Sequence, residues 1–283
     1  VHPDDERYRH LVGRRVVHPF VARTLPIVAD PVLVDPAFGT GAVKVTPAHD
    51  ANDLAAGERN GLERINIFTE RGEINENGGP FAGQDRFAAR KAVLAALAER
   101  GLRRGEKTHR HAVGHCQRCD TIVEPFLSRQ WFVRTRPLAE KAIAAVRQGH
   151  TRILPEAWAN TYFDWMENIR DWCISRQIWW GHQIPAWTCA ACGEIVVAVE
   201  TPRLCPACGG DRLAQEEDVL DTWFSSALWP FSTMGWPDQT PLLKTFYPTS
   251  VLVTAFDILF FWVARMMMMG LHFMQTVPFR DVY

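Results

Sequence analysis

Four residues in the first quarter of the chain have the types and spacing of a small polar pocket: Lys44, Thr46, Asp50 and Asp53. On a strand over residues 42–46 the first two would share one face, because side chains alternate along a strand. The two aspartates would share one face of a starting helix, since they lie three positions apart. Two carboxylates suit an ammonium group. The segment therefore predicts a pocket for a cationic, hydroxyl-bearing ligand; helix capping with a surface ion pair is the competing interpretation.

Two Cys-x-x-Cys pairs predict a metal site later in the chain. Cys189 and Cys192 form the first pair and Cys205 and Cys208 the second, with twelve residues between the pairs and a glycine after each. In such a turn two thiolates point at one metal, and the glycine accepts the unusual backbone angle that follows. Four thiolates make a closed tetrahedral site, so we predict a structural rather than a catalytic zinc ion.

A third pair, Cys116 and Cys119, has no second pair nearby. His109, His111 and His115 are candidate further ligands, but His115 adjoins Cys116 and is badly placed to share its metal. A redox dithiol is the alternative, although no thioredoxin-like sequence surrounds the pair. We interpret it as half of a zinc site whose other ligands lie outside this chain.

The composition is that of a globular protein with two regions of different character. The chain has 283 residues, of which 47% are hydrophobic and 22% charged, with a formal net charge of -1. The composition excludes a disordered, collagenous or coiled-coil chain. The near-zero net charge argues against a general polyanion binder, and the length predicts two domains. All 11 tryptophans lie between Trp131 and Trp262, and all seven cysteines follow position 115. This asymmetry indicates two parts with different roles.

Neither end of the chain has the pattern of a targeting or membrane-spanning segment. The first five residues have neither the basic start nor the apolar core of a signal peptide, and they lack an initiator Met, so we expect a fragment of a cytoplasmic protein. The apolar stretch over residues 251–274 is interrupted by Asp257, Arg265 and His272, which are costly inside a bilayer. We predict a buried strand over 251–254 followed by a buried helix, and no membrane span.

Short strands and a few helices are expected to position these residues. Residues 10–50 look rich in strands, with candidate runs at 16–17, 26–28, 32–34 and 42–46. Helices are predicted near residues 138–146 and 160–169 from their apolar periodicity.

A further helix is predicted over residues 86–100, with Asp85 as its N-cap, Gly101 after its end, and Phe87, Leu94 and Leu97 on one face. The basic run over residues 100–111 is interpreted either as a solvated connector or as a surface that faces RNA.

Five longer strings carry a family resemblance: HPDDERY (2–8), GTGAVKVTPAHD (39–50), WWGHQIP (179–185), DTWFSS (221–226) and VLVTAFDILFFW (251–262). Together, and across essentially the whole chain, they closely resemble the valyl-tRNA synthetases, a family of class I aminoacyl-tRNA synthetases. The isoleucyl and leucyl relatives share the architecture, whereas the third and fourth strings look specifically valyl.

The resemblance implies an α/β fold of two incomplete domains. Residues 1–110 would be the later part of an inserted, mixed and β-rich editing domain. Residues 111–283 would be the second part of a Rossmann-type catalytic domain, with a zinc-ribbon insertion at 186–214.

The resemblance also implies an activity, that of a valine–tRNA ligase, which activates L-valine with ATP, transfers it to tRNA(Val), and hydrolyses threonine mischarged on that tRNA. Lys44, Thr46, Asp50 and Asp53 match the editing pocket. The aspartates would hold the α-ammonium group, with Asp50 or Thr46 helping to recognise the threonine hydroxyl, and a positioned water would attack the ester.

In the synthetic half, Trp180 and Trp223 match the walls of the valine pocket, and Asp257 matches a strand-end position facing the amino acid or adenylate. The implied partners are tRNA(Val), L-valine and ATP. The implied cofactors are structural zinc, and Mg²⁺ with ATP in the full-length enzyme, which we expect to be a cytoplasmic monomer.

Two motifs of class I synthetases, of the His-Ile-Gly-His and Lys-Met-Ser-Lys-Ser types, are absent from the chain. We therefore expect the chain alone to be inactive in aminoacylation. Two alternatives remain beside the ligase fragment: a zinc-ribbon RNA-binding module, and a stand-alone aminoacyl-tRNA deacylase.

Overall fold

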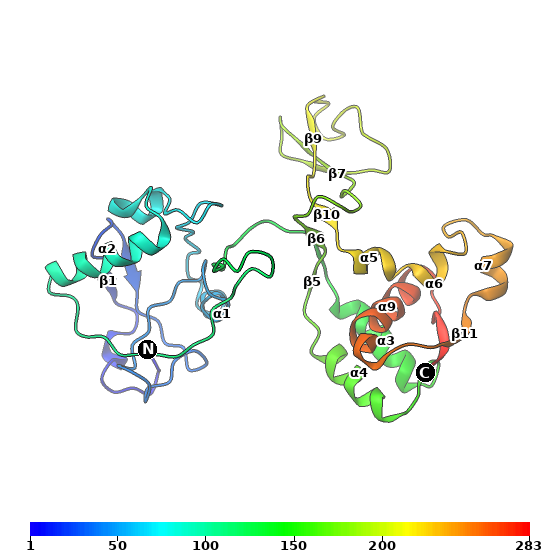
Figure 1. Cartoon of the computed structure of the whole chain (residues 1–283), viewed down its shortest axis with the longest axis horizontal. Helices are drawn as coiled ribbons and strands as arrows, with labels where there is room; N and C mark the ends of the chain where they lie inside the picture. The colour runs from blue at the N-terminus through cyan, green and yellow to red at the C-terminus, as the bar shows by residue number, and fades with distance from the viewer. The chain divides into compact units, whose positions relative to one another are not determined.

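The computed structural model describes residues 1–283 and divides into two compact units, Val1–Ser128 and Arg129–Tyr283 (Figure 1). This division falls later than the domain break expected after residue 110. Residues 111–128 stay with the first unit because they bond to its helix α2 (Arg86–Glu99). The Arg86 guanidinium donates to the carbonyl oxygen of Ile122 at 2.7 Å, and its Nε lies 3.3 Å from a carboxylate oxygen of Glu124.

The first unit contains little regular secondary structure. Its one sheet is an antiparallel hairpin of two strands, in which Val16 pairs with Leu25. Its elements in chain order are η1 (Arg9–Leu11), β1 (Arg15–Val17), β2 (Thr24–Pro26), α1 (Ala51–Asn60), η2 (Glu76–Phe81) and α2.

The expectation of several strands over residues 10–50 is wrong outside this hairpin. Residues 16–17 lie in β1, but β2 ends at Pro26, where the expected 26–28 run would begin. Instead of a strand over 32–34, residues 31–33 form a turn, because the Asp30 carboxylate accepts hydrogen bonds from the N–H groups of Val32 and Leu33, both at 2.9 Å. Residues 42–46 pair with no other strand. An alternating pattern makes a strand only where a partner strand takes up its backbone hydrogen bonds.

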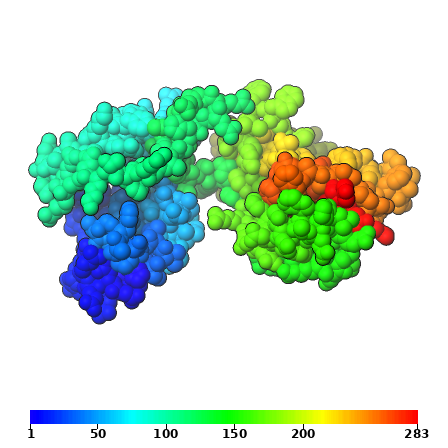
Figure 2. Space-filling model, turned by 60° about the horizontal axis from the view of Figure 1, so that its bottom comes forward, coloured from blue at the N-terminus to red at the C-terminus, as the bar shows by residue number.

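The helix predicted over residues 86–100 is confirmed as α2. Asp85 Oδ1 accepts hydrogen bonds from the N–H groups of Phe87 at 2.9 Å and Ala88 at 3.3 Å, which satisfies N–H groups that have no partner inside the helix. The apolar face is less covered than expected, since Phe87 and Leu94 remain 39% and 41% exposed. The basic residues that follow α2 are exposed, as both a connector and an RNA-facing surface require. The segment that carries them lies on the surface of the first unit (Figure 2).

The second unit is built on a parallel sheet of three strands in the order β11 (Thr249–Leu252), β12 (Phe279–Val282) and β4 (Arg152–Ile153). Asp281 of the central strand lies opposite Val251 on one side and Arg152 on the other. Three helices supply most of the packing: α3 (Arg136–Arg147), α4 (Ala157–Glu167) and α9 (Ala264–Phe273). The mixed α/β content and the helices expected near 138–146 and 160–169 are confirmed.

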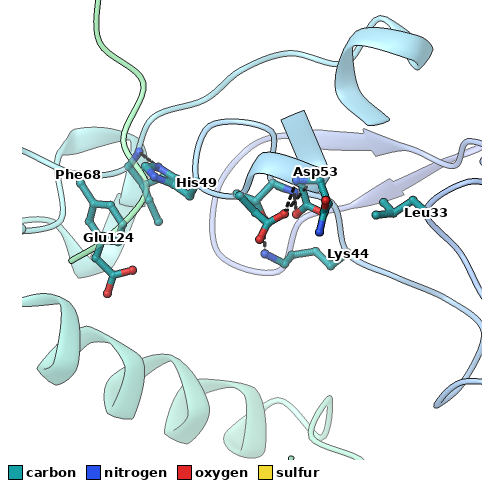
Figure 3. Close-up of a pocket in the computed structure, with 10 residues that line it drawn as sticks. Leu33, Lys44, His49, Asp53, Phe68 and Glu124 are labelled. Atoms are coloured by element: carbon teal, nitrogen blue, oxygen red, sulfur yellow. Dashed lines mark hydrogen bonds between the residues drawn. The ribbon is translucent and has the colours of Figure 1, made fainter. Parts of the chain in front are cut away.

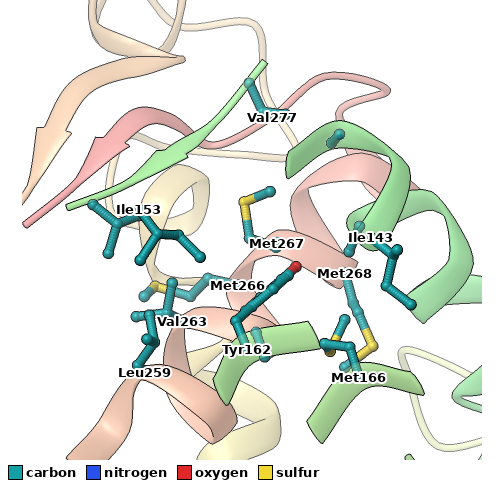
Figure 4. Close-up of a cluster of buried hydrophobic side chains, with 14 of the residues drawn as sticks. Ile143, Ile153, Tyr162, Met166, Leu259, Val263, Met266, Met267, Met268 and Val277 are labelled. Carbon is teal, nitrogen blue, oxygen red and sulfur yellow. The ribbon is translucent and has the colours of Figure 1, made fainter. Parts of the chain in front are cut away.

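A methionine-rich core holds these helices together (Figure 4). Met266, Met267 and Met268 of α9 are at most 1% exposed and contact Tyr162 and Met166 of α4 within one apolar cluster. Three consecutive buried positions mean that α9 is covered on several sides, which no amphipathic surface helix achieves.

A strand followed by a helix is present over residues 249–273 as predicted, but the strand spans Thr249–Leu252 instead of 251–254 and is not buried: Val251 and Val253 are 53% and 74% exposed. β11 is followed by α8 (Phe256–Ile258), the π-helical turn η3 (Leu259–Val263) and α9. The run Phe256–Phe273 is long and apolar enough to cross a membrane. Length and composition do not distinguish such a span from the core helix of a soluble protein, which meets the same criterion. Here α9 packs against α3 in the protein core.

An antiparallel sheet of three strands carries the two cysteine pairs of residues 186–214. Strand β7 (Ala186–Cys189) is central, between β8 (Ile195–Val197) and β9 (Leu213–Gln215). A second antiparallel pair, β6 (Ser175–Arg176) with β10 (Val219–Leu220), encloses this insertion in the sequence (Figure 1). The other elements are β3 (Phe132–Val133), β5 (Trp172–Cys173), α5 (Thr222–Ser226), α6 (Trp229–Ser232) and α7 (Pro241–Phe246).

Candidate functional site

A pocket of about 400 Å³ in the first unit brings the four predicted polar residues together (Figure 3). Its walls come from four separate stretches of the chain. They comprise Leu33, Lys44, Thr46, His49, Asp50, Asn52, Asp53, Ile67, Phe68 and Glu124.

The two aspartates each have one oxygen engaged locally. Asp50 is the N-cap of α1, and its Oδ1 accepts hydrogen bonds from the N–H groups of Asn52 at 2.8 Å and Asp53 at 3.0 Å. Asp53 Oδ2 accepts the N–H of Thr46 at 2.6 Å. The second oxygen of each carboxylate has no protein partner. Helix capping and ligand binding are therefore compatible here, because each carboxylate has an oxygen for each task.

Lys44 and Thr46 meet at the same pocket although their segment is not a strand. The Lys44 ammonium donates to the Thr46 hydroxyl, and both side chains line the pocket with the aspartates. The pocket thus offers one cation, one hydroxyl and two carboxylates. Such a set can bind a ligand that carries an ammonium group and a hydroxyl.

The loop that leads into Lys44 is held by residues of the N-terminal HPDDERY string. The Arg7 guanidinium donates to both oxygens of the buried Asp5, at 2.8 and 2.6 Å, and to the carbonyl oxygen of Pro36 at 2.9 Å. This hydrogen bond from Arg7 holds the pKa of Asp5 below its usual value. A side chain at Gly41 would lie 2.5 Å from Arg7 Nη2, and the φ of +76° there also favours glycine.

A second buried aspartate ties the end of α1 to the wall of the pocket. Asp30, 4% exposed, accepts hydrogen bonds from Arg59 and Asn60 as well as from the Leu33 N–H. Burial opposes the charge on Asp30, but the N–H of Leu33 and the guanidinium of Arg59 offset that effect and leave its pKa below the usual value. Since Leu33 lines the pocket, this ion pair links the helix to the pocket wall.

Phe68, Glu124 and His49 also line the pocket. No sequence pattern predicts the first two as pocket residues, and the sequence alone assigns no role to His49. His49 Nε2 accepts the N–H of Ile67 at 3.0 Å, its Nδ1 lies 2.9 Å from the carbonyl oxygen of Pro125, and its ring meets the Phe68 ring edge-on at 4.7 Å. His49 adjoins Asp50 in the sequence, which is a signal that could have found it. Glu124 lies too far along the chain for any local pattern to connect it with Asp50.

The sulfur atoms of Cys189, Cys192, Cys205 and Cys208 all lie within 4.8 Å of one another. The Sγ atoms of Cys189 and Cys208 are 3.6 Å apart, and those of Cys192 and Cys205 are 3.7 Å apart. Zinc–sulfur bonds of about 2.3 Å in a tetrahedron place sulfur atoms about 3.8 Å apart, so the cluster fits this metal. Backbone N–H groups of Cys192 and Ala191 lower the pKa of Cys189 to about 7, which favours the thiolate form that binds zinc.

The other pair, Cys116 and Cys119, forms no such cluster. No third cysteine, histidine or carboxylate completes a group around it. A hydrogen bond with the Thr121 hydroxyl, at 3.2 Å, lowers the pKa of Cys119. His115 is engaged with Asp120, and His109 stacks on His111. The histidines considered from the sequence are thus not brought to this pair.

The three residues matched to a valine pocket are not brought into one cavity. Trp180 is 87% exposed, Trp223 meets the Phe261 ring edge-on at 4.7 Å, and Asp257 is exposed in the first turn of α8. No ring contact joins the two tryptophans. Near them, the Ser225 hydroxyl lies 3.4 Å from His182 Nδ1.

The second unit contains a buried charge network around Asp221 that no sequence motif predicts. Asp221, 5% exposed, accepts hydrogen bonds from Trp172 Nε1 at 2.9 Å and Arg176 Nη2 at 2.8 Å, and caps α5 through the Trp223 N–H. Arg265 lies over the Trp172 ring, 3.8 Å from its centre. The network fixes the start of the DTWFSS string against β5 and β6.

Comparison with known proteins adds the family context. The model of the class I tRNA synthetases (I, L, M and V) matches residues 48–207 and 203–283. Valine–tRNA ligases are similar over the whole chain: those of Geobacter sulfurreducens, Syntrophotalea carbinolica and Thermotoga maritima are 63%, 62% and 56% identical over 283 residues. The chain spans about a third of their length: 32%, 31% and 33%. Among solved structures, methionyl-tRNA synthetase of Mycobacterium tuberculosis with methionyl-adenylate is 18% identical over 60% of this chain and 28% of its own, with a TM-score of 0.40.

Proposed function

The chain belongs to the class I tRNA synthetases of the isoleucine, leucine, methionine and valine group, and we propose that it is an internal part of a valine–tRNA ligase. The observation that carries the proposal is 63% identity to such a ligase over all 283 residues. The reaction of the whole protein would be activation of L-valine with ATP and Mg²⁺, followed by transfer to tRNA(Val). Neither alternative, an RNA-binding ribbon or a stand-alone deacylase, accounts for similarity that extends over both units.

For the first unit we propose hydrolytic editing. A valine site cannot strongly reject threonine, which has nearly the same shape with a hydroxyl in place of a methyl group, so a second site that removes threonine is required for accuracy. The pocket of Lys44, Thr46, Asp50 and Asp53 suits this task, because its two unengaged carboxylate oxygens can bind the α-ammonium group of a threonyl ester. The Thr46 hydroxyl, or Asp50, would recognise the threonine hydroxyl.

The proposed chemistry needs no nucleophile from the protein. A water oxygen forms a bond to the ester carbonyl carbon, the bond from that carbon to the ribose oxygen breaks, and the ribose oxygen takes up a proton. The pocket's role is to hold the ester so that only a hydroxyl-bearing side chain places its carbonyl within reach of that water.

For the second unit we propose the later part of a Rossmann-type catalytic domain, with residues 186–214 as a zinc ribbon. The four clustered cysteines would hold zinc in a structural role. Cys116 and Cys119 would form half of a second zinc site completed by residues outside this chain. The parallel strands β11, β12 and β4 with their packed helices support the Rossmann assignment. Trp180, Trp223 and Asp257 would contact valine or its adenylate once the whole enzyme is assembled, and we propose a cytoplasmic monomer.

A mischarging assay tests the proposal in a full-length protein that contains this chain. Asp50→Ala should leave valylation of tRNA(Val) unchanged and allow threonyl-tRNA(Val) to accumulate, because only the editing pocket is altered. Glu70→Ala, at an exposed residue outside the pocket, is the control and should accumulate none. Absence of valylation by the unmodified protein, or charging with another amino acid, would refute the ligase assignment.

A further inference from the structure

Both ring nitrogens of His49 are hydrogen-bonded, and in opposite senses. The Ile67 N–H donates to Nε2 at 3.0 Å, so Nε2 presents a lone pair and carries no proton. The partner of Nδ1, at 2.9 Å, is the carbonyl oxygen of Pro125, which can only accept. Nδ1 must therefore carry the proton. The two bonds together define one state of the ring, a neutral imidazole protonated on Nδ1.

The ring joins three stretches of chain that line the pocket. His49 closes the turn that begins at Thr46, where its own N–H donates to the Thr46 carbonyl oxygen at 3.0 Å, and Asp50 follows it directly. Ile67 lies on the second stretch, and Pro125 follows Glu124 on the third. Figure 3 shows His49 between Phe68 and Glu124 on one side and Lys44 and Asp53 on the other. One side chain thus ties the capping aspartate to the opposite wall.

We propose that His49 is a positioning residue of this pocket and that its neutral, Nδ1-protonated form holds Asp50 and Glu124 on opposite walls. The ring touches no reacting atom; it acts through the Ile67 and Pro125 backbone. A second proton, on Nε2, would face the Ile67 N–H and remove that bond, because two donors cannot share it. The consequence for catalysis rests on the proposed editing function, whereas the tautomer and the tie between segments do not.

Two measurements on the 283-residue chain test the tie itself. The nitrogen-15 spectrum of the unmodified chain at neutral pH should show His49 protonated on Nδ1 and bare on Nε2. Amide exchange at Ile67 should accelerate roughly tenfold in His49→Phe, which keeps a ring against Phe68 but has no acceptor for that N–H. His49→Gln should stay within about threefold of the parent, since its amide oxygen can accept in place of Nε2. His10→Phe, at an exposed histidine in the same unit, is the matched control and should leave Ile67 unchanged.

Hydrolysis of threonyl-tRNA(Val) by the full-length protein tests the consequence. His49→Phe should lower the rate by roughly tenfold, and His49→Gln should restore most of it, in parallel with exchange at Ile67. An Nε2-protonated ring, unchanged exchange in His49→Phe, or exchange that changes while hydrolysis does not would each overturn the proposal. If the unmodified protein hydrolyses no threonyl ester, the proposed function fails, and the tautomer and exchange results still decide whether His49 holds the two walls.

Discussion

The carboxylate of Asp53 accepts the backbone N–H of Thr46 at 2.6 Å, across seven residues of chain. This bond folds the segment that carries Lys44 and Thr46 back onto the first turn of α1. It leaves Asp53 Oδ1 without a protein partner, as Asp50 Oδ2 also is, so the bond that builds the pocket still leaves a carboxylate oxygen free for a ligand.

Asp50 caps α1 and, in the proposed function, also binds the ligand; two substitutions separate these roles. Asp50→Ser keeps a capping oxygen and should leave the free energy of unfolding nearly unchanged, whereas Asp50→Ala should lower it by about 1 kcal/mol. Both should lose hydrolysis of threonyl-tRNA(Val), because neither offers a carboxylate oxygen. Urea unfolding of the chain and hydrolysis by the full-length protein are the measurements. A fully active Asp50→Ser protein would restrict Asp50 to capping.

The buried Asp30 should make stability depend on pH. Its pKa in the folded chain lies below the value of about 3.9 for an unfolded chain. Its stabilising contribution is therefore complete above that value and is lost as the pH falls through the folded-state pKa. Asp30→Asn should be less stable than the parent at pH 7, with a difference that shrinks at acid pH. Urea unfolding measures this difference, and the exposed Asp4→Asn control should show none. If the loss of stability in Asp30→Asn grew as the pH fell, the lowered pKa of Asp30 would be contradicted.

The four-cysteine cluster should bind zinc for structure alone. Cys205→Ser should lose the metal and the protection of amides in β7–β9, since a closed site cannot spare a ligand. Cys173→Ser, at a cysteine outside the cluster, should keep both. Zinc content and amide exchange give the answer. If Cys205→Ser kept its full zinc content, the zinc would have to be bound outside the four-cysteine cluster.

Asp221 should be the most sensitive acidic residue of the second unit. Asp221→Asn removes the charge that faces Arg176 and Arg265 and should cost about 3 kcal/mol in the free energy of unfolding, because a buried ion pair loses one partner. Asp211→Asn, at an exposed position, is the control and should change stability by no more than about 0.5 kcal/mol. Equal stability of the two variants would contradict the role of Asp221.

Local chemistry in the sequence predicted local structure well. Asp85 and Gly101 marked the ends of α2, and the Cys-x-x-Cys spacing identified the sulfur cluster, because caps and knuckles depend on neighbours a few residues away. The strand expected over residues 42–46 failed because no partner strand exists, a fact that lies outside the segment. Lys44 and Thr46 nevertheless meet, through side-chain contact with each other and a backbone bond to Asp53.

Contacts across long stretches of chain decided the rest of the site. Glu124 lines the pocket because the segment around it is bonded to Arg86 of α2 and to His49, and Phe68 lines it from another distant segment. No periodicity in the sequence predicts these long-range contacts. Likewise, Trp180 stands exposed on a bend, although the string around it predicted a pocket wall. A short sequence string identifies candidate site residues, but the residues that they contact lie elsewhere in the chain, and the string does not predict them.

The most direct measurement is hydrolysis of preformed threonyl-tRNA(Val), beside valyl-tRNA(Val), by a full-length protein that contains this chain. The unmodified protein and the exposed-site control Glu70→Gln should hydrolyse the threonyl ester much faster than the valyl ester. Asp53→Asn keeps an oxygen for the Thr46 N–H but loses the charge for the ammonium group, and should slow threonyl hydrolysis by roughly tenfold or more. Equal rates for the two esters, or an Asp53→Asn protein as fast as the parent, would contradict an editing role for this pocket.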